Sequence, residues 1–158
     1  MDLEKTLKRL QAALQYARAH SSFYAALPDV SPKTLAEYAA FPLLTPNDLA
    51  LHGTELLCCS PSRVRRIVSL ETSGTSGARK RIFFTERDLD ATVDFFHHGM
   101  QAVCNGANRV GILMPGANPD GLCDLLSRGI RRFGGVPLVY GAIRDTDDCA
   151  RWCRENNV

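Results

Sequence analysis

Nine residues near the middle of the chain combine side chains that bind phosphate groups. Four hydroxyls, two glycines and two cations occur in the run Thr72-Ser73-Gly74-Thr75-Ser76-Gly77-Ala78-Arg79-Lys80. Glycines let successive backbone N–H groups turn toward one anion, the hydroxyls add donors, and Lys80 supplies positive charge. The composition predicts a loop that holds a chain of phosphates. The alternative is an ordinary flexible turn between two strands, where Gly and Ser are common for conformational reasons.

The glycine spacing excludes three common motifs. Gly74 and Gly77 are separated by two residues, whereas the Walker loop G-x-x-x-x-G-K has four residues between its glycines. The loop also lacks the G-x-G-x-x-G of dinucleotide-binding folds and the G-x-S-x-G of a nucleophile elbow. A strand rather than a helix is expected after the loop, so a helix dipole makes no contribution to anion binding here.

Two short β-prone runs flank this loop and would position it. Residues 67–70 and 81–84 are rich in β-branched and aromatic side chains, which predicts a β-hairpin with the loop at its tip. Helix and strand patterns then alternate, with strands at 110–114 and 136–140 and helices that start near residues 85, 118 and 145. This order predicts an α/β fold in which a βαβαβα parallel-sheet unit with right-handed crossovers follows the hairpin.

The residues before the hairpin favour helices. Leucines at positions 3, 7, 10 and 14 share one face of a helix over 2–20. A hydroxyl followed by proline predicts two short helix starts, at Ser31-Pro32 and at Thr45-Pro46. We therefore expect a helical N-terminal segment over 1–66 and a partial α/β nucleotide-binding subdomain over 67–158. The alternation calls for a further strand after Val158, so we expect the chain to be the front part of an incomplete large domain.

The loop resembles the phosphate-binding motif of the AMP-forming adenylating enzymes, the acyl-adenylate and acyl-CoA ligase superfamily. The pattern of that motif is roughly [ST]-[ST]-G-[ST]-[ST]-G-x-P-K, and the matching residues are Thr72, Ser73, Gly74, Thr75, Ser76, Gly77 and Lys80. The flanks Phe41-Pro42-Leu43-Leu44-Thr45 and Phe84-Thr85 look most like the phenylacetate–CoA ligase group. The motif's proline is Arg79 here, which releases the backbone angle that proline would fix.

This resemblance implies the N-terminal fragment of an ATP-dependent carboxylic acid–CoA ligase. Such an enzyme adenylates a small carboxylic acid with Mg-ATP, releases pyrophosphate, and transfers the acyl group to coenzyme A or another thiol. Residues 72–77 and Lys80 would contact the β- and γ-phosphates. The superfamily's adenine pocket, hinge and catalytic lysine would follow Val158, so the fragment alone is expected to be inactive, with no complete catalytic set and no metal ligands. The alternatives are a stand-alone phosphate- or nucleotide-binding module and an interaction domain.

Composition argues against other classes of partner. The 158 residues carry 19 Lys and Arg against 17 Asp and Glu, and a net charge of +2 does not indicate a nucleic-acid partner. No apolar run approaches the ~20 residues that cross a bilayer, and the charged start Met1-Asp2-Leu3-Glu4-Lys5 lacks signal-peptide features. We expect a cytoplasmic protein without a membrane partner, with its six cysteines as free thiols. The leucine face of the first helix could also support a homodimer.

Overall fold

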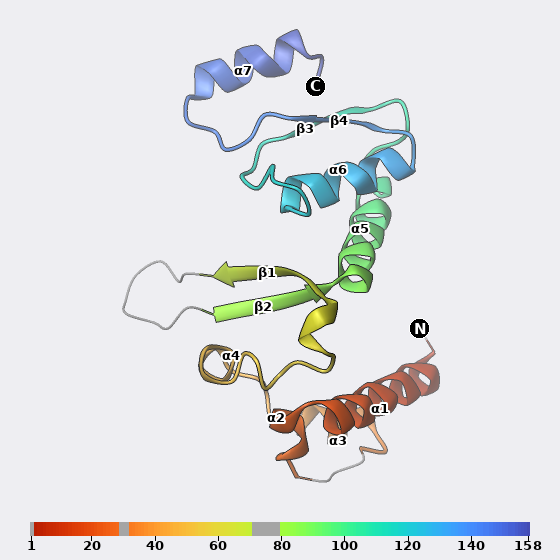
Figure 1. Ribbon diagram of the computed structural model, residues 1–158. Coiled ribbons are helices and arrows are strands. Elements are labelled where there is room, and N and C mark those ends of the chain that lie inside the picture. The colour runs from red at the N-terminus through yellow and green to blue at the C-terminus, as the bar shows by residue number, and fades with distance from the viewer. Residues whose placement is uncertain (1, 29–31, 71–79) are drawn as a thin grey trace. The chain divides into compact units, whose positions relative to one another are not determined.

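The computed structural model describes residues 2–28, 32–70 and 80–158 and has mixed α/β architecture (Figure 1). Its elements are α1 (Leu3–His20), α2 (Ser22–Ala25), α3 (Leu35–Ala39), α4 (Pro46–Leu51), the 3-10 helix η1 (Pro61–Arg63), β1 (Val64–Leu70), β2 (Lys80–Thr85), α5 (Glu86–Gln101), β3 (Arg109–Ile112), α6 (Leu122–Arg132), β4 (Val136–Val139) and α7 (Thr146–Glu155). The predicted α/β class with a helical N-terminal segment is confirmed. The chain divides into two compact units, Met1–Phe84 and Thr85–Val158. The predicted division at residues 66 and 67 stays a prediction.

A buried serine joins the first two helices to a later loop of the first unit. The backbone N–H of Ser21 donates to the carbonyl of Ala17 at the end of α1, and its hydroxyl accepts a hydrogen bond from the backbone N–H of Tyr24 in α2. The same hydroxyl donates to the carbonyl of Glu55 over 2.7 Å. Because Ser21 is buried, these bonds satisfy polar groups that have no access to water.

One of the two predicted hydroxyl–proline helix starts is correct and the other is wrong. α4 begins at Pro46 with a capping box, in which the Thr45 hydroxyl accepts from the backbone N–H of Asp48 and the Asp48 carboxylate accepts from the backbone N–H of Thr45. No helix follows Ser31-Pro32, because Pro32 is buried and its carbonyl accepts a 2.6 Å hydrogen bond from Gln11 of α1. The helix α3 begins later, where the Thr34 hydroxyl caps its first turn.

The hairpin that the sequence predicts is formed by β1 and β2, which pair with each other and run in opposite directions (Figure 1). Along β1, Arg65, Ile67 and Ser69 are exposed, whereas the residues between them are partly buried. This alternation is expected of a strand with one face toward the protein and one toward water. The predicted phosphate loop connects the two strands, and residues 71–79 of it lie outside the described residues.

The second unit contains a two-stranded parallel sheet between helices. β3 and β4 pair in parallel, in a register that runs from Arg109↔Val136 to Ile112↔Val139. Ile112 packs with Cys123, Leu126 and Ile130 of α6, and the next residue along, Gly111, lies against Trp152 of α7 and Val158. The two helices therefore cover opposite faces of this sheet (Figure 1). The predicted helix start near residue 118 is wrong, because residues 118–121 form a turn, in which the backbone N–H of Gly121 donates to the carbonyl of Asn118, and α6 begins at Leu122.

A buried hydroxyl in α6 leads to a stability prediction. Ser127 is 3% exposed, and its Oγ has no hydrogen-bond partner among the residues that the structure describes. We expect Ser127→Ala to raise the free energy of unfolding by about 1 kcal/mol, because an unsatisfied buried hydroxyl is removed and alanine favours the helix. Urea unfolding measures the change. The same substitution at the fully bonded Ser21 should lower stability by about 1 kcal/mol, and a lower stability of Ser127→Ala would contradict the interpretation.

Within the described ranges, no helix has the length and apolar character needed to traverse a bilayer. The thiols are unpaired at Cys58, Cys59, Cys104, Cys123, Cys149 and Cys153. Burial raises the pKa of Cys58, Cys123 and Cys149, which lowers the thiolate fraction of each and hence its reactivity.

Candidate functional site

Of the seven predicted phosphate-binding residues, the structure describes Lys80. The other six lie outside the described residues, namely Thr72, Ser73, Gly74, Thr75, Ser76 and Gly77. Lys80 is the first residue of β2, with a half-buried side chain, and β1 ends at Leu70. The ammonium group of Lys80 has no hydrogen-bond or ion-pair partner among the described residues. The phosphate-binding role of these seven residues stays a prediction.

Two consecutive cations at the start of β2 lie on opposite faces of the hairpin. Lys80 and Arg81 are adjacent in an extended strand, and successive side chains of a strand point to opposite faces. Lys80 is half-buried, whereas Arg81 is exposed. The two positive charges therefore lie on different faces of the hairpin.

A cleft on the Arg81 side lies between β2 and the end of α4. It has a volume of about 490 Å³ and is lined by residues 49–51, Gly53, Thr54, Arg81 and Phe83. Gly53 allows the chain to pass close to α4, since a Cβ there would lie 3.1 Å from the carbonyl oxygen of Leu49. The lining combines one guanidinium, one hydroxyl and apolar side chains, which is the mixture found in sites for small organic ligands.

A smaller and more apolar pocket adjoins this cleft. Its volume is about 170 Å³, and it shares Leu49, Gly53, Arg81 and Phe83 with the cleft. The side chains that complete its lining come from Tyr24, Leu44, Leu56, Leu57 and Ile82. Neither cavity could be predicted from the sequence, because the lining residues come from segments far apart in the chain and no spacing pattern links them.

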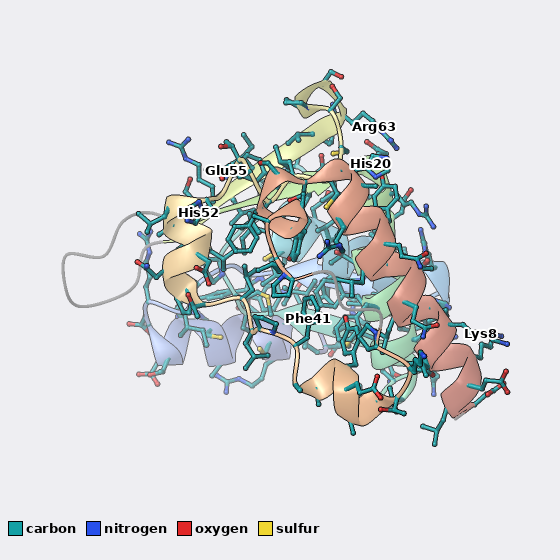
Figure 2. The ribbon with its side chains drawn as sticks, turned by 90° about the horizontal axis from the view of Figure 1, so that it is seen from below. Lys8, His20, Phe41, His52, Glu55 and Arg63 are labelled. Carbon is teal, nitrogen blue, oxygen red and sulfur yellow. The ribbon has the colours of Figure 1, made fainter. Side chains whose placement is uncertain are left out.

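Hydrogen bonds hold the segment between α4 and η1 that lines these cavities. His52 Nδ1 lies 3.2 Å from Glu55 Oε1, and the two side chains lie next to each other after the end of α4 (Figure 2). The His52 ring also packs on Phe23, with ring centroids 5.3 Å apart. The Glu55 carbonyl accepts from the buried Ser21 hydroxyl. These contacts position Gly53 and Thr54 at the cleft.

The second unit carries a polar network where β4 ends. The Tyr140 hydroxyl donates to Asp148 Oδ2 over 2.8 Å, Arg151 donates to Asp148 Oδ1 over 2.6 Å, and the Tyr140 ring packs on Trp152. The hydrogen bond to Asp148 is the main cause that raises the pKa of Tyr140 to about 12. The bond from Arg151 is the main cause that lowers the pKa of Asp148. The network ties the end of β4 to α7.

This network predicts an unusual titration of Tyr140. The folded-state pKa is raised to about 12, above an ordinary value of 10, so the network stabilises the fold below pH 10 and its contribution is lost as the pH rises toward 12. At pH 11 a free tyrosine is about 90% ionised, whereas Tyr140 should remain mostly protonated. NMR of ¹³C-labelled tyrosine measures this directly. Asp148→Ala should return the midpoint toward 10, and an unchanged midpoint in that variant would exclude Asp148 as the cause.

The donor set of the loop suits an anion rather than a metal ion. No carboxylate, imidazole or thiol occurs between Thr72 and Lys80, and hard cations such as Mg²⁺ are held by oxygen ligands, above all carboxylates and phosphates. In the part of the chain that the structure describes, no three His, Cys, Asp or Glu residues are grouped so that they could hold a metal ion. The candidate chemistry of the loop is therefore phosphate binding.

Comparisons with known proteins identify the fold. No family model and no curated protein matches the sequence. An open conformation of 2-hydroxyisobutyryl-CoA ligase in complex with 2-HIB-AMP and CoA matches with a TM-score of 0.72 and 18% identity, over 96% of this chain and 38% of the ligase chain. The thioesterification state of the same ligase, also in complex with 2-HIB-AMP and CoA, matches with a TM-score of 0.73 and 20% identity, over 96% of this chain and 35% of the ligase chain. The postadenylation state in complex with 2-HIB-AMP matches with a TM-score of 0.72 and 18% identity, over 94% of this chain and 34% of the ligase chain. The chain therefore shares the fold of part of this ligase and spans little more than a third of its length.

Proposed function

We propose that this chain is the N-terminal part of an ATP-dependent, AMP-forming carboxylic acid–thiol ligase. The observation that carries the proposal is the position of the motif-like loop 72–80, between paired strands of a chain whose fold matches such a ligase over 96% of its length. The fold alone hosts many functions. Its coincidence with seven matching residues of the phosphate-binding motif supports adenylation chemistry.

In this function the chain supplies positioning and charge. The substrate carboxylate attacks the α-phosphate of ATP, the bond to the β-phosphate breaks, and pyrophosphate leaves with the electron pair. Residues 72–77 and Lys80 would hold the β- and γ-phosphates, so that negative charge developing on pyrophosphate meets donors that are already in place. Mg²⁺ would enter with the phosphates of ATP, because the loop itself has no carboxylate.

The substrate and thiol are finer parts of this proposal. The ligase structures that share the fold hold 2-HIB-AMP and CoA, which supports a small carboxylic acid and coenzyme A for this chain. The flanks Phe41-Pro42-Leu43-Leu44-Thr45 and Phe84-Thr85 favour the phenylacetate–CoA ligase group. A cytoplasmic location and a homodimer belong to the same proposal, and light scattering in solution tests the dimer.

Acid-dependent ATP–pyrophosphate exchange tests the proposed reaction. The assay uses the complete reading frame that contains this chain, with phenylacetate, 2-hydroxyisobutyrate and acetate as candidate acids. We expect exchange that requires both Mg²⁺ and one of the acids, and no exchange from residues 1–158 alone. A complete reading frame without exchange for any acid would contradict the ligase. Exchange supported by phenylacetate would favour the finer group assignment, and exchange with 2-hydroxyisobutyrate alone would contradict it.

A further inference from the structure

The guanidinium of Arg81 lies at the cleft between α4 and β2. Other arginines of the chain, such as Arg128, Arg132 and Arg151, each bond to an aspartate. Arg81 is exposed, and within residues 2–28, 32–70 and 80–158 no side chain or carbonyl forms a hydrogen bond or ion pair with its guanidinium. A guanidinium presents a planar set of donors that fits a carboxylate with two parallel hydrogen bonds. The cleft therefore offers one unused site for an organic anion.

The pocket beside Arg81 can take the apolar body of such an anion. Its volume of about 170 Å³ is close to that of an apolar cavity of about 150 Å³ that binds benzene. Leu44, Leu56 and Ile82 contribute to its lining. Burial is the main cause that raises the pKa of Tyr24, another lining residue, which agrees with an environment of low polarity.

Apolar side chains around these cavities are left in contact with water. Leu51 at the cleft is 64% exposed, and Leu44 at the smaller pocket is 42% exposed. Covering such side chains with an apolar ligand removes their surface from water, which favours the complex. Hydrophobic burial and the charge of Arg81 thus favour the same class of ligand.

We propose that this cleft binds a small organic acid, with its carboxylate on Arg81 and an aromatic or branched aliphatic body in the adjoining pocket. A carboxylate is favoured over a phosphate monoester, because the lining holds one cation and a phosphate monoester carries about two negative charges. The site is additional to the phosphate loop, since Lys80 lines neither the cleft nor the adjoining pocket. It does not depend on the chain being part of a ligase.

Titration of the ¹⁵N-labelled chain with benzoate tests this site. We expect saturable shifts of the backbone amides of Gly53, Thr54 and Arg81, and contacts in NOE spectra between benzoate ring protons and the methyl groups of Leu56. Arg81→Gln should weaken benzoate binding about 10-fold, because a charge-assisted hydrogen-bond pair is lost. The matched control Arg63→Gln removes an exposed cation that does not line the cleft, and it should bind like the wild type.

Further probes separate this site from the phosphate loop. Benzyl alcohol, which has no charge, should bind about 10-fold more weakly than benzoate, and phenyl phosphate should not bind more tightly. Lys80→Ala should retain benzoate binding, whereas Arg81→Gln should retain any binding of inorganic tripolyphosphate. The proposal is overturned if Arg81→Gln, with an otherwise unchanged spectrum, binds benzoate like the wild type. It is also overturned if benzoate shifts residues outside the cleft only, or if phenyl phosphate binds more tightly than benzoate.

Discussion

Lys80→Ala is expected to lower acid-dependent ATP–pyrophosphate exchange about 100-fold, within the range found when one preorganised donor to a developing anion is removed. In the proposed reaction the ammonium group faces the phosphates that become pyrophosphate, so its charge matters more as the bond to the α-phosphate breaks. The loss should therefore fall mainly on kcat and less on the KM for the carboxylic acid, which does not contact this residue.

Two control variants sharpen the Lys80 experiment. Lys80→Arg keeps the charge and should recover part of the exchange rate, although a guanidinium is larger and planar. Arg87→Ala removes an exposed cation from the first turn of α5 and should leave exchange unchanged. If Lys80→Ala exchanges within about three-fold of the wild type, donors of this kind cannot be acting on pyrophosphate from this position, and the phosphate-loop assignment fails.

Gly129→Val is expected to destabilise the second unit by about 3 kcal/mol, the upper part of the range for overpacking a close contact. A Cβ at Gly129 of α6 would lie 2.8 Å from the Cβ of Phe96, 2.9 Å from the backbone nitrogen of His97 and 3.1 Å from the carbonyl oxygen of Val93. Two of these atoms belong to the backbone of α5, so they cannot move aside as a flexible side chain would. Relief of the contact requires the two helices to separate.

Gly99 on α5 provides the matched control for this prediction. A Cβ at Gly99 would meet no atom within 4 Å, so Gly99→Val should change stability by less than about 1 kcal/mol, since valine favours a helix slightly more than glycine. Thermal unfolding followed by circular dichroism should give a midpoint roughly 10 °C lower for Gly129→Val. Equal effects of the two substitutions would show that helix propensity, and not the approach of α5 to α6, determines stability here.

Ion pairs along the same two helices explain why their approach is specific. Arg132 of α6 pairs with Asp94 of α5, and Arg128 pairs with Asp90 one turn away. The residues of each pair are 38 positions apart, so no local pattern in the sequence could indicate them. Surface pairs of this type each contribute at most about 1 kcal/mol, and the close contact at Gly129 has the larger effect.

Local patterns in the sequence determined the elements of the fold. The hydroxyl and proline at Thr45 and Pro46 predict the start of α4. The hydroxyl and carboxylate at Thr85 and Asp88 predict the start of α5, because a capping box needs only residues three positions apart. The hairpin strands and the alternation of strand and helix were likewise predictable, since side-chain periodicity of two or 3.6 residues is a property of neighbouring residues. The composition of the phosphate loop was also readable in the chain itself.

Only the tertiary structure decided which of these elements meet. Pro32 does not start a helix because its carbonyl is held by Gln11 of α1, and β3 and β4 pair in a two-stranded sheet that is separate from the predicted hairpin. The cleft at Arg81 arises because Gly53 brings the segment after α4 against β2. Contacts between residues far apart in the chain depend on packing and on the approach of backbones, and a single sequence carries no local signal of them. The sequence alone therefore predicted most of the elements and the candidate phosphate loop, whereas packing decided the cleft at Arg81.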